Sequence, residues 1–185
     1  MISSLITSQT RVRLLMKFFL NHRTKAYLRG LESEFGESTN AIRVELNRLE
    51  SAGLLISIHE GNKKFFQANF NHPLFKDIHS IILKETGIDK VIEKVIQRLG
   101  DLICVYLTGD FAKGRDSNMI ELILVGSRID REYLSRKISQ AEEIVKRKVS
   151  YIILEPLEAE EHLARYMVSD LLPLWNCDGN IIQGD

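Results

Sequence analysis

Apolar positions recur at helical spacing in the first third of the chain. One face of residues 10–21 carries apolar side chains three or four positions apart, namely Val12, Leu15, Met16, Phe19 and Leu20. This period predicts an amphipathic helix. Ser8 or Thr10 has a side chain suited to capping its first turn.

Two further helices are expected close behind the first. Residues 28–35 form a short helical pattern that ends at Gly36, a residue suited to the left-handed conformation after a helix. Ser38 can cap a third helix over 39–52, whose apolar face consists of Ile42, Leu46 and Leu49. Two helices around a short turn are the layout of a helix-turn-helix.

The pattern then changes from helical to strand-like. Residues 55–60 and 64–69 are two apolar runs separated by Gly61, Asn62 and Lys63. A glycine and an asparagine between two such runs favour a hairpin turn. A two-stranded hairpin directly after the third helix would be the wing of a winged helix-turn-helix.

Strands alternate with helices in the second half, after a break at Asn71, His72 and Pro73. The expected elements are helices over 74–86 and 88–99, strands over 102–108 and 120–125, a helix over 131–148, a strand over 149–154, helical residues over 157–172 and a tail over 173–185. Such alternation is typical of a small α/β domain. We therefore predict an α+β chain with a winged helix-turn-helix over 1–72, a linking helix over 73–88 and a small α/β domain over 89–185.

Charge is distributed unevenly, although the net charge of the 185 residues is zero. Residues 1–87 hold 12 Lys and Arg against 8 Asp and Glu, whereas residues 88–185 hold 13 against 17. Phosphates respond to local charge, so the basic first half favours a nucleic-acid partner.

Other composition signals narrow the class of protein. No apolar run approaches the length of a membrane span, and the first residues lack the layout of a signal peptide. Cys104 and Cys177 form no metal or redox pattern. A cytoplasmic protein with no membrane partner, metal or cofactor is therefore expected.

The segment FGESTNAIRVELNRLESAGLL resembles the winged helix-turn-helix transcriptional regulators of bacteria, with a likeness that extends over roughly residues 8–70. If the apolar face of the third helix turns inward, four polar residues point outward, namely Thr39, Asn40, Arg43 and Asn47. Arginine pairs with guanine edges and asparagine with adenine edges in the major groove. Glu45 and Glu50 lie on the same helix and would repel phosphate if they faced it.

The resemblance implies a set of DNA-binding residues and a partner. The expected set is Ser38, Thr39, Asn40, Arg43, Asn47, Lys63 and Lys64, with the two lysines at the hairpin tip, where cations meet phosphates. The expected partner is double-stranded DNA. The protein is expected to bind it as a homodimer, because two-fold symmetry lets paired winged helices contact two half-sites.

The segment VYLTGDFAKGRDSNMIELILVG resembles the minimal nucleotidyltransferase family over about residues 90–155. In that family a strand leads into a Gly-Ser turn, and an Asp-x-Asp pair follows on the next strand. Gly109 matches the family glycine, but Asp110 stands where the phosphate-binding serine belongs. Met119 and Glu121 stand at the two metal-binding aspartates. The strand expected over 149–154 lacks the third carboxylate.

These departures imply a degenerate nucleotide site that consists of Gly109, Asp110, Lys113 and Glu121. Phosphoryl transfer with two metal ions needs carboxylate ligands, and methionine is a poor ligand for magnesium. The chain is therefore not expected to be an enzyme. Taken together, it resembles a bacterial winged helix-turn-helix regulator fused to a degenerate minimal nucleotidyltransferase-like domain.

A DNA-binding transcriptional regulator is the function that these patterns favour. The second domain would then serve dimerisation, sensing or partner contact, and an unidentified small molecule stays open as a ligand. Two alternatives remain open at this point: a DNA-tethered nucleotidyltransferase and an adaptor that uses its winged helix to bind other proteins.

Overall fold

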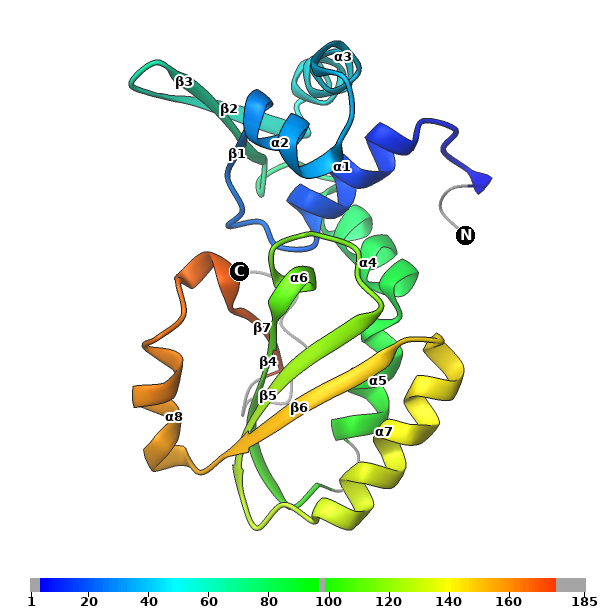
Figure 1. Ribbon diagram of the computed structural model, residues 1–185, viewed down its shortest axis with the longest axis vertical. Helices are drawn as coiled ribbons and strands as arrows, with labels where there is room; N and C mark the ends of the chain where they lie inside the picture. Colours follow the sequence, from blue (N-terminus) through cyan, green and yellow to red (C-terminus); the bar gives the residue numbers. More distant parts are fainter. Residues whose placement is uncertain (1–3, 97–98, 176–185) are drawn as a thin grey trace. The chain divides into compact units, whose positions relative to one another are not determined.

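The structure, a computed structural model, describes residues 4–96 and 99–175 (Figure 1). It is a mixed α+β structure with two separate sheets. The chain divides into two compact units, Met1–Glu85 and Thr86–Asp185.

Three helices open the first unit, as the hydrophobic pattern predicts. They are α1 (Gln9–Phe19), α2 (Leu28–Phe35) and α3 (Thr39–Ser51). Ser8 and Ser38 cap α1 and α3, because each hydroxyl accepts a hydrogen bond from a backbone N–H three residues further on, at 3.2 Å. Gly36 ends α2 in the left-handed conformation, with φ at 64°.

A small antiparallel sheet completes this part of the first unit. Its strands are β1 (Ala26–Tyr27), β2 (Leu55–Glu60) and β3 (Lys63–Ala68), in the order β1-β3-β2. Gly61 and Asn62 form the turn of the predicted hairpin, and Gly61 supplies the positive φ of 58°. The sequence pattern missed β1, because two residues are too short to show a period.

The core of the first unit lies between the helices and the sheet. Its fully buried side chains include Leu14, Phe18, Phe19, Leu31, Ile42 and Leu46. Helix α4 (Phe75–Thr86) closes this core with Phe75, whose ring lies 5.6 Å from that of Phe19. The Nδ1 of His79 donates a hydrogen bond of 2.6 Å to the carbonyl oxygen of Phe19, which fixes α4 to the end of α1.

A four-stranded sheet forms the centre of the second unit. Its strands are β4 (Asp101–Thr108), β5 (Met119–Ser127), β6 (Lys148–Leu154) and β7 (Leu172–Trp175), in the order β6-β5-β4-β7. Only β5 and β6 run parallel, whereas β4 is antiparallel to both of its neighbours. The sheet is therefore mixed, and the helix α7 (Arg131–Val145) forms the crossover between its two parallel strands.

Helices lie on both faces of this sheet (Figure 1). They are α5 (Ile88–Ile96), the short α6 (Gly109–Ala112), α7 (Arg131–Val145) and α8 (Pro156–Leu163). Helices α5 and α7 pack against each other on one face. On the other face, Ala159 of α8 packs on Ile123 and Val125 of β5. In the described part of the chain, no helix has both the length and the apolar character that crossing a bilayer requires.

The predictions for the C-terminal part were partly wrong. The helix expected over 157–172 ends at Leu163, and a 3-10 turn follows at Val168–Asp170. Part of the expected tail is instead strand β7, in which Trp175 lies opposite Val105. The sequence did not predict this strand, because Pro173 argues against a strand. A proline is tolerated there because β7 is an edge strand. Residues 176–185 and 97–98 lie outside the described residues.

Candidate functional site

Helix α3 has one buried apolar face and one exposed polar face, as its sequence predicts. The buried face contains Ile42, Leu46 and Leu49, and the exposed face contains Asn40, Arg43 and Asn47. Thr39 is half-buried at the start of the helix, and the hydroxyl of Ser38 caps the helix. Of the four residues expected to point outward, three are therefore clearly exposed.

A groove of about 630 Å³ runs between α3, the start of α2 and the hairpin. We call it the basic groove. It is lined by Tyr27, Leu28, Arg29, Arg43, Leu46, Asn47, Asn62, Lys63, Lys64 and Phe66. Within residues 4–96 and 99–175, four cations and no carboxylate line it, so the groove is electropositive.

The first acidic residue of α3 is turned away from this groove. Glu45 is buried, and its carboxylate lies 2.8 Å from Nε of Arg11 and 3.1 Å from Arg48. Burial alone would raise the pKa of Glu45. Hydrogen bonds from Arg11 and Ser8 and the charges of Arg11 and Arg48 outweigh burial and hold this pKa below its usual value. Glu45 thus stays ionised and joins α3 to α1.

The second acidic residue of α3 holds the hairpin. Glu50 accepts hydrogen bonds from Lys64 at 2.8 Å and from Ser57 at 2.6 Å, one residue on each strand. The hydrogen bond from Lys64, followed by that from Ser57, holds the pKa of Glu50 below its usual value. Lys64, one residue further from the turn than Lys63, is therefore held against α3 by this ion pair. Lys63 begins β3, and its Nζ lies 4.5 Å from the centre of the Tyr27 ring.

Part of the basic groove carries no recognisable signal in the sequence. Arg29 and Tyr27 reach it from the start of α2, and Asn62 reaches it from the hairpin turn. No local pattern identifies them, because only the pairing of β1 with β3 brings the start of α2 beside the hairpin.

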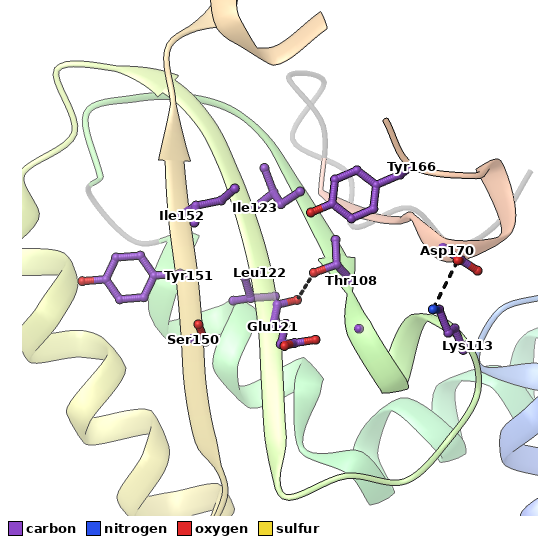
Figure 2. A pocket seen from close by; sticks show the side chains of 11 residues that line it. Thr108, Lys113, Glu121, Leu122, Ile123, Ser150, Tyr151, Ile152, Tyr166 and Asp170 are labelled. Atoms are coloured by element: carbon purple, nitrogen blue, oxygen red, sulfur yellow. Dashed lines mark hydrogen bonds and ion pairs between the residues drawn. The ribbon is translucent and has the colours of Figure 1, made fainter. Parts of the chain in front are cut away.

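A second candidate site is a cavity of about 330 Å³ in the second unit (Figure 2). We call it the sheet cavity. It is lined by Thr108, Gly109, Lys113, Glu121, Leu122, Ile123, Ser150, Tyr151, Ile152, Tyr166 and Asp170. Alternate side chains of a strand point to opposite faces of a sheet. Glu121 and Ile123 therefore face the cavity, whereas the ring of Tyr151 points away from it (Figure 2).

Gly109 and Glu121 are in direct contact at one end of the sheet cavity. Gly109 has a φ of 68°, which favours glycine, and a Cβ atom built on it would overlap the Oε2 of Glu121. The carboxylate of Glu121 thus rests on the glycine backbone. A phosphate that approached the same backbone would meet this negative charge.

Three of the four predicted nucleotide-site residues come together in the cavity, and the fourth does not. Lys113 forms an ion pair of 3.3 Å with Asp170 at the cavity wall. Asp110 lies outside the lining, because it turns toward Arg115, with which it forms an ion pair of 2.6 Å. Asp110 therefore does not line the cavity, and its part in a nucleotide site stays a prediction.

The cavity does not suit a pair of magnesium ions. Met119 is 44% exposed at the start of β5 and does not line the cavity. On β6, the residue in register with Glu121 is Ser150, which offers only a hydroxyl. Among the described residues, no three His, Cys, Asp or Glu side chains gather in a group that could hold a metal ion. Glu121, which has no ion pair within residues 4–96 and 99–175, and Asp170, which is paired with Lys113, do not supply the ligands that two metal ions need.

Several cavity residues carry no recognisable signal in the sequence. Tyr166 and Asp170 follow α8, and Thr108 ends β4. These residues meet only because the sheet order places β5 between β4 and β6, and because the chain after α8 returns to pair β7 with β4.

Comparisons with known proteins add little to this picture. No family model and no curated protein matches the chain. Solved structures that resemble it include a presumed nucleotidyltransferase from Sulfolobus solfataricus, 21% identical, which covers 57% of this chain and 92% of its own, with a TM-score of 0.38. Another is a toxin-antitoxin with AMP-PNP, 20% identical, covering 51% of this chain and 74% of its own, with a TM-score of 0.36. At TM-scores this low, neither likeness carries an argument about this chain.

Replacing Gly109 by alanine should reveal its contact with Glu121. Gly109→Ala is expected to cost about 1–2 kcal/mol of stability for the left-handed backbone, and more because Glu121 must move. In a Glu121→Ala background, only the backbone cost should remain. Urea unfolding of the native protein, both single variants and the double variant measures the coupling. Strictly additive costs would show that the contact does not exist.

Proposed function

We propose that this protein is a DNA-binding transcriptional regulator. The observation that carries the proposal is the basic groove, in which Arg29, Arg43, Lys63 and Lys64 gather beside an exposed helix face. Cations placed in this way neutralise backbone phosphates and release their counterions, which is the main source of affinity for DNA.

The connectivity of the first unit supports a winged helix-turn-helix. Helices α2 and α3 are joined by a short turn, the hairpin follows directly, and β1 pairs with the hairpin to give the order β1-β3-β2. In this proposal α3 is the recognition helix and the hairpin β2–β3 is the wing.

The exposed face of α3 suits contacts with base edges. Arg43 and Asn47 are one helical turn apart, so their side chains lie on the same face. Arginine makes paired hydrogen bonds to guanine, and asparagine makes them to adenine. Asn40 is exposed one turn before Arg43, where the first turns of a recognition helix enter the groove. We assign phosphate contacts to Arg29 and Lys63.

A homodimer on two half-sites is part of the proposal. Closed two-fold symmetry is the commonest arrangement of soluble oligomers, and it would set two copies of α3 in successive major grooves. The second unit would then provide the dimer surface or respond to a ligand.

Fluorescence anisotropy with a labelled random-sequence duplex tests the basic groove. Arg43→Ala and Lys63→Ala should both weaken binding, because each removes a cation from the groove. Lys63→Ala should also reduce the slope of log K against log salt by about 1, since one phosphate contact is lost. Lys84→Ala is the matched control, because Lys84 is an exposed cation on α4, away from the groove. If the two groove variants and the control bind alike, the protein-binding adaptor would replace this proposal.

We further propose that the second unit is a nucleotidyltransferase-like domain that has lost its activity. The turn at Gly109 between β4 and β5 supports the likeness to that fold. Met119, which stands at one of the two Asp-x-Asp positions, and the lack of a carboxylate over residues 149–153 of β6 support the loss, because metal ions neutralise the charge that develops during phosphoryl transfer.

An incorporation assay separates this proposal from a DNA-tethered nucleotidyltransferase. Incubating the intact protein with magnesium, duplex DNA and labelled nucleoside triphosphates should yield no labelled product above a protein-free control. Magnesium-dependent turnover that disappears in Glu121→Gln would show instead that the remaining carboxylate is catalytic.

A further inference from the structure

We propose that the sheet cavity binds a small aromatic amine, with the protonated amine at Glu121 and the aromatic ring against Tyr166, Ile123 and Ile152. The proposal rests on the absence of nucleotidyl transfer argued above. Ligand binding is measured separately from labelled-nucleotide incorporation, so either proposal can fail without the other.

The polar end of the cavity favours a cation over a phosphate. Two carboxylates line the cavity against one lysine, and that lysine, Lys113, is already paired with Asp170. In the part of the chain that the structure describes, Glu121 forms no ion pair with a Lys or Arg side chain. Its carboxylate can therefore accept hydrogen bonds from a ligand amine, whereas it would repel an anion.

Hydroxyl groups surround this end of the cavity. Thr108 donates a hydrogen bond of 3.4 Å to the backbone oxygen of Glu121, which fixes the strand beside Gly109 (Figure 2). Ser150, in register with Glu121 on the neighbouring strand, offers its hydroxyl oxygen as a second acceptor. An ammonium group has three donors and no acceptor, so a carboxylate with a neighbouring hydroxyl suits it.

The other end of the cavity is apolar. Ile123 is 1% exposed and forms the floor, whereas Ile152 on the neighbouring strand is 40% exposed. The side chain of Tyr166 extends toward Ile123 from the segment after α8 (Figure 2). Tyr166 already packs on the cluster that contains Ile123, so a planar ring laid on Ile152 beside Tyr166 would cover the exposed surface of Ile152 and gain an aromatic contact.

The distance between the two ends limits the size of the ligand. Ile123 follows Glu121 by two residues on β5, and Ile152 follows Ser150 by two residues on β6. Two residues of a strand span about 6.6 Å, so an amine and a ring joined by a two-carbon linker are short enough to reach both ends. A cavity of about 330 Å³ lies near the lower end of the range of about 300–1,000 Å³ for small-molecule sites, which suits such a ligand.

Calorimetry with the full chain and three probes tests the proposal. Tryptamine should bind, whereas indole-3-propionate, which has the same ring and an anion in place of the amine, should bind at least about tenfold more weakly. ATP with magnesium should bind more weakly than tryptamine. Glu121→Gln should lower the affinity for tryptamine about tenfold. The matched control is Glu158→Gln, which removes an exposed acid of α8 outside the cavity and should change nothing.

Any one of four results would overturn the proposal. The first two are a lack of saturable tryptamine binding at millimolar concentrations, and equal affinities for tryptamine and indole-3-propionate. The other two are tighter binding of ATP than of tryptamine, and a Glu121→Gln variant that binds tryptamine as tightly as the native protein does. Ile152→Arg serves as a second variant if Glu121→Gln fails to fold, because Ile152 is partly exposed and tolerates a polar side chain. It should abolish tryptamine binding by filling the apolar end, and native-like binding by this variant would also refute the site.

Discussion

Both carboxylates of helix α3 form ion pairs with cations of the first unit. The positive charge of the surface beside α3 depends on these ion pairs. Glu45 is buried between Arg11 and Arg48, and Glu50 bonds Lys64. A buried carboxylate without its partner is strongly destabilising, so these pairs help to hold α1 and the hairpin against α3. They also leave the basic groove without a carboxylate among the described residues that line it. The same ion pairs therefore fix the position of α3 and leave the basic groove beside it positively charged.

In the second unit, ion pairing leaves a negative charge at the sheet cavity, whereas in the first unit it leaves positive charges at the basic groove. At the sheet cavity, Lys113 is engaged by Asp170, and the carboxylate of Glu121 lies on the backbone of Gly109. The basic groove therefore favours anions, while the cavity disfavours them. Under the proposed function, the first unit would bind the phosphate backbone of DNA and the second unit would not catalyse phosphoryl transfer.

Local features of both units could be predicted from the sequence. The caps Ser8 and Ser38, the terminator Gly36 and the turn at Gly61 depend on neighbouring residues only, so their chemistry can be recognised along the chain. The period of α3 likewise predicted that Arg43 would be exposed. These features identified four of the ten residues that line the basic groove, namely Arg43, Asn47, Lys63 and Lys64, before any tertiary contact was known.

Features that depend on distant segments could not be predicted in this way. Lys64 and Glu50 are 14 positions apart, and their ion pair follows from how the hairpin folds back on α3. Tyr166 reaches the cavity only after α8 has ended, where no period predicts a structure. Asp110 matched a family position in the sequence, yet its side chain turned to Arg115, because a carboxylate pairs with the nearest cation that it can reach.

If α3 recognises bases through Arg43, a selection of bound duplexes from a random pool should reveal it. The native protein and an Arg43→Gln variant would each be used to enrich bound sequences. The native protein should enrich a defined motif, and the variant should enrich a motif that has lost a preference for guanine at one position in each half-site. The absence of any motif for the native protein, or the same motif for both proteins, would contradict it.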